Sequence, residues 1–255
     1  MKVAVIGAGV MGEALIAGLQ RFGVSDIAIV EKNEARRDEI VTKYRVSVGG
    51  VEECDVVLLV TKPQDLDGVV TGLKLKSSAL VISFAAGKKT AGIEKLLPEG
   101  FRVVRVMPNT PLLISNGMSA VTAGKNATSE DIEWVRSFLS KSGKVIVVPE
   151  ELQDAVTATS GSGPAYFFAM VEAMAGAAEK LGLSSDDAMT LAKETLIGAA
   201  AMLRESGKDA KTLRENVTSP KGTTAAALSK LSESNFEGLV YEAMKAARDR
   251  SIELS

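Results

Sequence analysis

Apolar runs alternate with amphipathic stretches along the first 149 residues of the chain. Several runs, such as 56–60, contain no polar residue, which is typical of strands that are covered on both faces. The stretches between the runs repeat apolar side chains at helical spacing, as at Met11, Leu15 and Leu19. This alternation predicts a doubly wound α/β fold with a mainly parallel sheet. The expected strands are 2–6, 27–30, 56–60, 79–82, 103–106 and 145–148.

The composition of the chain changes after Glu150, where the β-branched runs stop and Ala, Met, Leu, Glu and Lys dominate. These residues favour helix, and Gly182 is well placed to end one. We therefore expect two domains, a Rossmann-type domain at 1–150 and an all-α domain at 151–255. The expected helices are 164–181, 185–204, 208–215, 223–231 and 236–252.

The first of these helices carries small or apolar side chains on several faces, including Ala169, Ala173 and Gly176. A helix that is apolar nearly all round is expected to be buried nearly all round. So small a domain hides such a helix more easily by pairing with a second copy of the chain. This predicts a homodimer; the alternative is a helix that is buried within its own domain.

A glycine-rich turn at residues 7–12 follows the first expected strand and precedes a helix. Gly7 permits a tight turn, Gly9 lets the backbone approach a phosphate, and Gly12 lets helix and strand pack closely. The N-terminus of the following helix favours an anion at the same place. Strand, turn and helix in this order predict a site for a dinucleotide.

The end of the second strand bears on which dinucleotide is bound. Glu31 lies 19 residues after Gly12, where an acidic side chain accepts hydrogen bonds from the adenosine ribose of NAD. The basic side chains of Lys32, Arg36 and Arg37 favour the 2′-phosphate of NADP instead. The pattern leaves the choice between NAD and NADP open, with use of both as the favoured interpretation.

Three further strands are followed by unusual loops, at 61–63, 84–87 and 107–111. Because ligands bind outside the carboxyl ends of the strands in open α/β sheets, we expect these loops to gather beside the glycine turn. Small residues at 85–87 leave room for a flat ring, and Asn109 and Thr110 offer hydrogen bonds at its edge. Lys62 offers a charge for phosphate or ribose oxygens. Ordinary turn chemistry is the alternative for each loop taken alone.

Two stretches of the helical part, 159–166 and 216–224, combine hydroxyl side chains with an expected helix start. The unpaired backbone N–H groups of such a start bind carboxylate or phosphate. Simple capping of the helix is the alternative for both stretches.

Composition excludes several kinds of chemistry. The 255 residues contain no histidine, which removes His general bases, His-based triads and His metal ligands. The single cysteine, Cys54, cannot build a thiolate cluster, so no metal is expected. A net charge of −2 with interspersed acids and bases gives no footprint for nucleic acid. Without a leader or an apolar run of membrane length, the expectation is a cytoplasmic protein with a small-molecule partner and no membrane contact.

Several of these motifs follow one another in a characteristic order. They include Ile-Gly-Ala-Gly-Val-Met at 6–11, Val-Thr-Lys-Pro at 60–63, Ile-Ser-Phe-Ala-Ala-Gly at 82–87, Arg-Val-Met-Pro-Asn-Thr-Pro at 105–111, Ser-Gly-Ser-Gly-Pro-Ala-Tyr at 160–166 and Val-Thr-Ser-Pro at 217–220. In this order they resemble the pyrroline-5-carboxylate reductases along nearly the whole chain. The resemblance implies a Rossmann domain, a helical dimerisation domain and NAD(P)H-dependent reduction of 1-pyrroline-5-carboxylate to L-proline, the last step of proline biosynthesis. It also implies dimers that often assemble further, commonly into decamers.

The resemblance also implies roles for individual residues. The segments that correspond to cofactor binding contain Ile6, Gly7, Ala8, Gly9, Val10, Met11, Val60, Thr61, Lys62, Pro63, Phe84, Ala85 and Ala86, and the strand-end argument adds Glu31 and Lys32. The substrate-binding residues are expected to be Asn109, Ser219, Pro220, Gly222, Thr223 and Thr224. Thr224 matches the hydroxyl that hydrogen-bonds the ring nitrogen of the substrate, which makes it the expected catalytic residue.

One residue departs from the family pattern, which has Ser-Pro-Gly-Gly before the threonines. Lys221 replaces the first of these glycines. If the position requires a positive φ, the lysine is strained; if it does not, the ammonium group adds attraction for a carboxylate.

Two alternatives to this function remain open at the level of the sequence. A related reductase of another imine or of a 3-hydroxy acid would draw on a lysine of the second domain, such as Lys180 or Lys193. A non-catalytic sensor would bind NAD(P) and control a partner protein.

Overall fold

A computed structural model describes residues 1–254 of the chain. These residues form two compact units along the sequence. The first consists of residues 1–162 together with 246–254, and the second is Gly163–Lys245. The last helix of the chain therefore contributes residues to both units.

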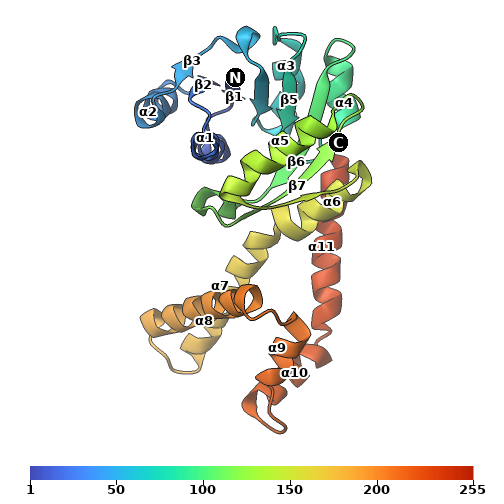
Figure 1. The fold of residues 1–255 in the computed structure, drawn as a ribbon. Helices are drawn as coiled ribbons and strands as arrows, with labels where there is room; N and C mark the ends of the chain where they lie inside the picture. The colour runs from blue at the N-terminus through green and yellow to red at the C-terminus, as the bar shows by residue number, and fades with distance from the viewer. Residues whose placement is uncertain (255) are drawn as a thin grey trace. The chain divides into compact units, whose positions relative to one another are not determined.

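The first unit is built on an eight-stranded sheet with the order β3-β2-β1-β4-β5-β6-β7-β8 (Figure 1). The strands from β3 to β6 are parallel, β7 runs antiparallel to β6, and β8 is parallel to β7. The doubly wound, mainly parallel fold expected from the sequence is confirmed. The strands are β1 Lys2–Ile6, β2 Asp26–Val30, β3 Ser47–Val48, β4 Val56–Leu59, β5 Leu80–Ser83, β6 Arg102–Pro108, β7 Gly117–Ala123 and β8 Gly143–Val147.

Helices cover both faces of this sheet because consecutive residues of a strand point to opposite sides. In β1, Val3 and Val5 belong to one hydrophobic core, while Ala4 and Ile6 belong to another. The first core includes residues of α1 and α5, and the second includes residues of α3 and α4. The helices are α1 Val10–Phe22, α2 Glu34–Tyr44, α3 Pro63–Thr71, α4 Thr90–Leu96 and α5 Ser129–Leu139, with short turns η1 Val51–Glu53, η2 Thr110–Ile114, η3 Ser140–Ser142 and η4 Glu150–Leu152.

The register of the sheet brings several strand ends into one row. Ile6 pairs with Val30 and with Leu59, Leu59 pairs with Ser83, and Ser83 pairs with Arg105. The residues that follow these five positions consequently start from the same edge of the sheet. β6 continues for three residues beyond this row, to Pro108.

The second unit consists of helices. α7 and α8 form a closely packed pair whose small core contains Ala175, Ala188 and Ala192 (Figure 1). Gly182 has a φ of 103° after α7, as expected for the glycine that ends a helix. The helices are α7 Gly163–Lys180, α8 Ser185–Glu205, α9 Ala210–Asn216, α10 Thr223–Glu233 and α11 Phe236–Glu253, of which α11 ends in the first unit.

The helix expected to start at residue 164 has helical backbone before it, which corrects one interpretation of the sequence. α6 Gln153–Val156 leads into a π-helical turn, η5 Thr157–Gly161, and then into α7. The backbone N–H of Ser162 donates to the carbonyl oxygen of Thr157 at 2.8 Å. The Ser162 amide is therefore not free, because helical backbone precedes α7 within the stretch 159–166. Binding of an anion there stays a prediction.

Candidate functional site

The glycine turn after β1 has a backbone that only glycine fits at two positions. Gly7 has a φ of 97°, and a Cβ atom placed on it would lie 2.6 Å from the carbonyl oxygen of Val60. A Cβ atom on Gly12 would collide with the carbonyl oxygen of Gly7. These two glycines let β1, β4 and α1 approach closely, as the sequence predicted.

Gly9 serves a different purpose, since a Cβ atom there would meet nothing within 4 Å. It is exposed and precedes α1, of which Val10 and Met11 are the first residues. The first amides of a helix have no partner within the helix and carry its positive dipole end. Bare backbone, open space and unpaired amides together fit a dinucleotide pyrophosphate.

Glu31 stands beside this turn, directly after β2. Its carboxylate accepts the backbone N–H of Ala8 and the backbone N–H of Asn33, both at 2.9 Å. The Asn33 side chain in turn accepts the N–H of Arg36 and caps α2. Turn, strand end and helix start thus fix the position of the Glu31 carboxylate.

Arg36 is not available as a free guanidinium, contrary to one interpretation of the sequence. Its three nitrogens donate to the carbonyl oxygen of Ala8 at 2.9 Å, to Glu39 at 2.7 Å and to Glu13 at 2.5 Å. Arg37 forms ion pairs with two acidic neighbours on its own helix, Glu34 and Asp38. Lys32 is exposed.

Glu13 is the centre of a cluster of charges next to the glycine turn. It accepts hydrogen bonds from Lys43 at 2.7 Å, from Arg36 at 2.5 Å and from Tyr44 at 3.0 Å. The bond from Lys43 first, and that from Arg36 second, lower the pKa of Glu13 from an ordinary value of 4.5 to about 2. The cluster ties α2 to α1.

Two further expected cofactor segments begin at the same sheet edge. Val60 follows β4, Thr61 and Lys62 connect it to α3, and Pro63 is the first residue of that helix. The Thr61 hydroxyl is buried without a hydrogen-bond partner, which is uncommon for a buried polar atom. An oxygen or amide of a bound ligand would supply that partner.

The segment after β5 is packed tightly. Phe84 and Ala85 are buried, and the N–H of Phe84 donates to the carbonyl oxygen of Leu59 at 2.9 Å. Ala86 lines a cavity of about 300 Å³ within the first unit, a volume at the lower end for small-molecule sites. The other lining residues are Met107, Thr157, Gly161, Ser162, Ala247, Arg250, Ser251 and Leu254.

Asn109 uses its side chain to organise the loop after β6. Its Oδ1 accepts the N–H of Met118 at 2.8 Å, and its Nδ2 donates to Ser160 at 3.3 Å. The expected contact between Asn109 and the substrate stays a prediction. The side-chain amide that would make this contact already forms these two hydrogen bonds within the protein.

The sequence did not predict a buried cluster of charged side chains around Arg105. Arg105 is 1% exposed and pairs with Glu150 at 2.5 Å and with Asp154 at 3.8 Å. Glu150 also accepts the N–H and the hydroxyl of Thr90 at 3.1 and 2.8 Å, and Asp154 accepts the hydroxyl of Ser251 at 2.7 Å. A charge inside the apolar run 103–106 was the available signal.

The remaining expected residues belong to the second unit. The N–H of Gly222 donates to the carbonyl oxygen of Ser219 at 3.0 Å, so 219–222 form a turn with Pro220 in its second position. Lys221 has a φ of 59°, and the first of the two interpretations of this residue, backbone strain, applies. Thr223 and Thr224 are the first residues of α10, so their amides point out of the helix start.

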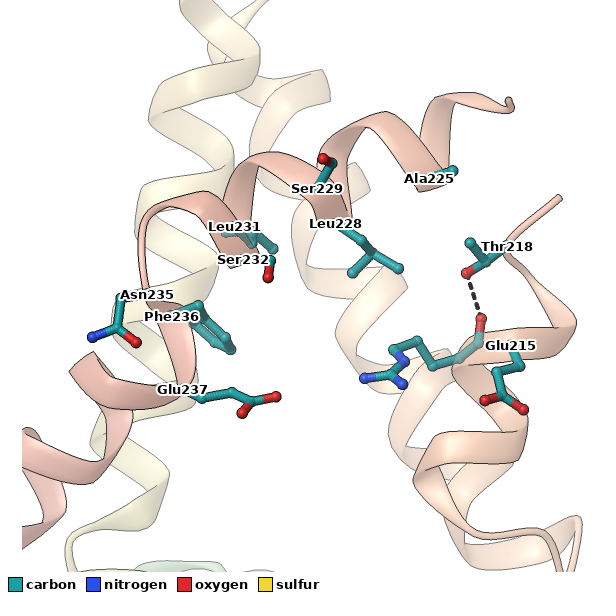
Figure 2. Close-up of a pocket in the computed structure, with 11 residues that line it drawn as sticks. Glu215, Thr218, Ala225, Leu228, Ser229, Leu231, Ser232, Asn235, Phe236 and Glu237 are labelled. Carbon is teal, nitrogen blue, oxygen red and sulfur yellow. Dashed lines mark hydrogen bonds between the residues drawn. The ribbon is translucent and has the colours of Figure 1, made fainter. Parts of the chain in front are cut away.

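The second unit also contains an open pocket of about 650 Å³, drawn in Figure 2. None of the expected substrate-binding residues lines it. Lys180 and Lys193, considered for a 3-hydroxy-acid reductase, are exposed and do not line it either. Its lining is Arg214, Glu215, Thr218, Ala225, Leu228, Ser229, Leu231, Ser232, Asn235, Phe236 and Glu237.

Comparison with known proteins gives two family models and many relatives. The model described as pyrroline-5-carboxylate reductase dimerisation matches residues 150–254, and the model described as NADP oxidoreductase coenzyme F420-dependent matches residues 2–87. A pyrroline-5-carboxylate reductase of Corynebacterium melassecola is 42% identical over 99% of this chain and 98% of its own. One from Methanosarcina acetivorans is 40% identical over 99% of this chain and 97% of its own.

The chain belongs to the pyrroline-5-carboxylate reductase family. It is an oxidoreductase of the NAD(P)-dependent kind. A solved pyrroline-5-carboxylate reductase from Coxiella burnetii matches with a TM-score of 0.91 and 34% identity, covering 100% of this chain and 98% of that one. A pyrroline carboxylate reductase from Plasmodium falciparum, solved with NADP bound, matches with a TM-score of 0.85 and 27% identity over 100% of this chain and 98% of that one.

Among residues 1–254, neither a membrane-spanning helix nor a metal-binding cluster is found. None of the helices described is both long enough and apolar enough to cross a membrane. Within the same residues, no group of three or more Cys, Asp and Glu side chains is arranged to hold a metal ion.

Proposed function

We propose that this protein reduces 1-pyrroline-5-carboxylate to L-proline with NAD(P)H, the last step of proline biosynthesis. The observation that carries the proposal is similarity of about 40% identity to pyrroline-5-carboxylate reductases over essentially the full length of both chains. The glycine turn and the unpartnered Thr61 hydroxyl support a dinucleotide at the sheet edge. The segment 1–150 is proposed as the nucleotide-binding domain and 151–255 as the helical domain for dimerisation and substrate.

The cofactor contacts are proposed for the residues at the carboxyl ends of β1, β2, β4 and β5. The exposed backbone at Gly9 and the amides of Val10 and Met11 would hold the pyrophosphate. The proposed set is Ile6, Gly7, Ala8, Gly9, Val10, Met11, Glu31, Lys32, Val60, Thr61, Lys62, Pro63, Phe84, Ala85 and Ala86.

The substrate carboxylate is proposed to bind the turn and helix start at 219–224. The amides of Thr223 and Thr224 lie at the positive end of α10, and the same two residues carry hydroxyl groups. The proposed substrate residues are Asn109, Ser219, Pro220, Gly222, Thr223 and Thr224.

The reaction requires few acid or base groups from the protein. A bound reduced nicotinamide supplies a hydride. In the protonated imine the hydride adds to the ring carbon of the C=N bond, and the electron pair of that bond moves to nitrogen. Thr224 is proposed to orient the nitrogen by a hydrogen bond, and the carboxylate contacts fix the ring. A chain without histidine is sufficient for this chemistry.

The proposal includes a homodimer that assembles in the cytoplasm without nucleic acid, membrane or metal, and decamers are the larger assembly to expect. The support for the dimer is the apolar surface of the second unit. On α7, Phe167 and Phe168 are 58% and 62% exposed in the single chain. Burying the exposed part of each of these side chains against a second copy contributes about 1–2 kcal/mol.

Steady-state kinetics of NADH and NADPH oxidation test the function directly. We expect turnover with 1-pyrroline-5-carboxylate and slower turnover with its six-membered analogue. The Thr224→Ala variant should lower kcat about tenfold to a hundredfold with little change in nucleotide affinity, as expected when one hydrogen bond to the reacting group is lost. Ser229→Ala, on the exposed side of α10, is the matched control. Oxidation of neither nucleotide would reject the proposal, and unchanged kinetics in Thr224→Ala would remove that residue from the mechanism.

A further inference from the structure

We infer that Glu31 makes this chain discriminate against the 2′-phosphate of NADP, so that NADH is its preferred reductant. The inference rests on the proposed function and deepens it by naming the specificity-determining residue. The family model over residues 2–87 is described as an NADP oxidoreductase, and one solved relative has NADP bound. The inference of an NADH preference therefore rests on the groups at this chain's own strand end and not on the relatives.

The first support is the fixed position of the carboxylate. Both Glu31 oxygens are anchored by backbone N–H groups, one from the glycine turn at Ala8 and one from Asn33, each at 2.9 Å. An ionised carboxylate has about four acceptor sites, so two remain for ribose hydroxyl groups. An acidic group at the end of the second strand of a Rossmann fold accepts the adenosine ribose hydroxyls. The same oxygens would face a dianionic phosphate on NADP.

The second support is that the neighbouring arginines are already neutralised. Arg36 donates to Glu13, to Glu39 and to the carbonyl oxygen of Ala8. Moving it to a phosphate would leave Glu13 with Lys43 and Tyr44 alone. Three of the five N–H donors of Arg36 are engaged and two carboxylates already balance its charge, so bidentate recognition of a phosphate would require it to give up some of these partners.

The other charged groups around the end of β2 do not offset the repulsion between Glu31 and a 2′-phosphate. Arg37 forms ion pairs with Glu34 and Asp38, and Lys43 forms one with Glu13. Lys32 remains as an exposed cation. A hydrated ammonium on a flexible stem is screened by solvent, whereas the Glu31 carboxylate is held in place. Taken together, these charges therefore favour a dinucleotide whose adenosine ribose carries no 2′-phosphate, which is NADH.

Equilibrium binding tests this without any turnover. The dissociation constants of NADH and NADPH are measured by nucleotide fluorescence in the absence of the imine. We expect NADH to bind at least about tenfold more tightly, since the Glu31 carboxylate repels the negative charges of the 2′-phosphate of NADPH. The concentrations of AMP and of adenosine 2′,5′-bisphosphate that displace bound NADH are then compared. This comparison measures the same preference without a contribution from the nicotinamide.

Three variants make the test specific. Glu31→Gln keeps an oxygen that can accept the Ala8 N–H. In this variant the dissociation constants of NADH and NADPH should differ by no more than about threefold. Glu99→Gln, which changes an exposed carboxylate away from the end of β2, should leave the ratio of the two dissociation constants within about twofold of that of the unmodified protein. Lys32→Ala should weaken the binding of NADPH by a larger factor than the binding of NADH, because its ammonium group is the exposed cation at this strand end.

The outcomes separate this inference from the proposed function. Equal or tighter binding of NADPH by the unmodified protein would overturn it, and so would a Glu31→Gln variant with an unchanged ratio. Binding of neither nucleotide would overturn both proposals. Preferred binding of NADH without formation of proline would support the inference and reject the proposed function.

Discussion

Lys221 adopts a left-handed backbone in the turn before α10, with a φ of 59°. This conformation costs a residue with a Cβ atom about 1–2 kcal/mol, while a glycine loses about 0.5–1 kcal/mol more conformational entropy on folding. Lys221→Gly should therefore raise the free energy of unfolding by about 0.5–1 kcal/mol, measured by urea denaturation.

Lys193 provides the matched control, because it is an exposed lysine in the middle of α8. Glycine in a helix interior is unfavourable by about 1 kcal/mol, so Lys193→Gly should lower the free energy of unfolding. If Lys221→Gly also lowered it, the strain assigned to Lys221 would be wrong.

Glu13 gives a second prediction at the scale of the residue. Its pKa is lower in the folded chain, at about 2, than its ordinary value of 4.5. The stabilisation is therefore complete above about pH 4.5 and is lost as the pH falls toward 2. Glu13→Gln should cost about 1–2 kcal/mol at pH 7, after allowance for solvent screening, and less at pH 3. Urea denaturation at both pH values checks this; a difference from the unmodified protein that did not shrink in acid would contradict it.

Single residues differ in how well the sequence predicted them. The roles of Gly7 and Gly12 followed from the motif because backbone crowding is set by the local strand, turn and helix. The partners of Arg36 could not be predicted, since Glu13 lies 23 residues away and approaches it only after the sheet has formed. Arg36 therefore looked available for phosphate in the sequence alone.

At the scale of the elements, the ion pair of Arg105 and Glu150 connects β6 to the chain after β8. Arg105 is fully buried, whereas the Glu150 side chain is 26% exposed. Removing one partner of a buried pair costs more than replacing both. Glu150→Gln should lower the free energy of unfolding by about 2–4 kcal/mol, because Asp154 at 3.8 Å compensates Arg105 only in part.

The double variant Arg105→Met, Glu150→Gln isolates this effect. It should be more stable than Glu150→Gln alone, since no partly paired guanidinium remains inside and Asp154 keeps its hydrogen bond from Ser251. Glutamine at 150 retains an acceptor for Thr90, so the start of α4 is not lost in either variant. A double variant less stable than the single one would show that Arg105 is stabilised by other groups. Urea denaturation of the three proteins, the unmodified chain and the two variants, gives the comparison.

Elements with strong local patterns were predicted well, and the others were missed for physical reasons. The apolar runs of β1 and β4 are strands covered on both faces. β7 is rich in small and polar residues and has no such run; its antiparallel pairing with β6 makes it a strand. The π-helical turn at Thr157–Gly161 has no sequence signal either, because a wider helical turn uses the same residue types.

At the scale of the whole molecule, the apolar surface of the second unit leads to a prediction about assembly. Its exposed side chains include Leu181, Leu239 and Tyr241, at 87%, 66% and 62% exposed. Patches of this kind mark interfaces. Sedimentation equilibrium should give a mass of at least two 26.7-kDa chains. A single-chain mass at micromolar concentration would contradict the proposed homodimer.

The transfer of hydrogen from nucleotide to imine is the central claim. Incubation of the protein with 1-pyrroline-5-carboxylate and NADH deuterated at the reactive face of C4, followed by mass spectrometry of the product, tests it most directly. We expect L-proline with one deuterium at C5, the former imine carbon. Unlabelled proline from both C4-deuterated epimers, or oxidation of NADH without formation of proline, would contradict it.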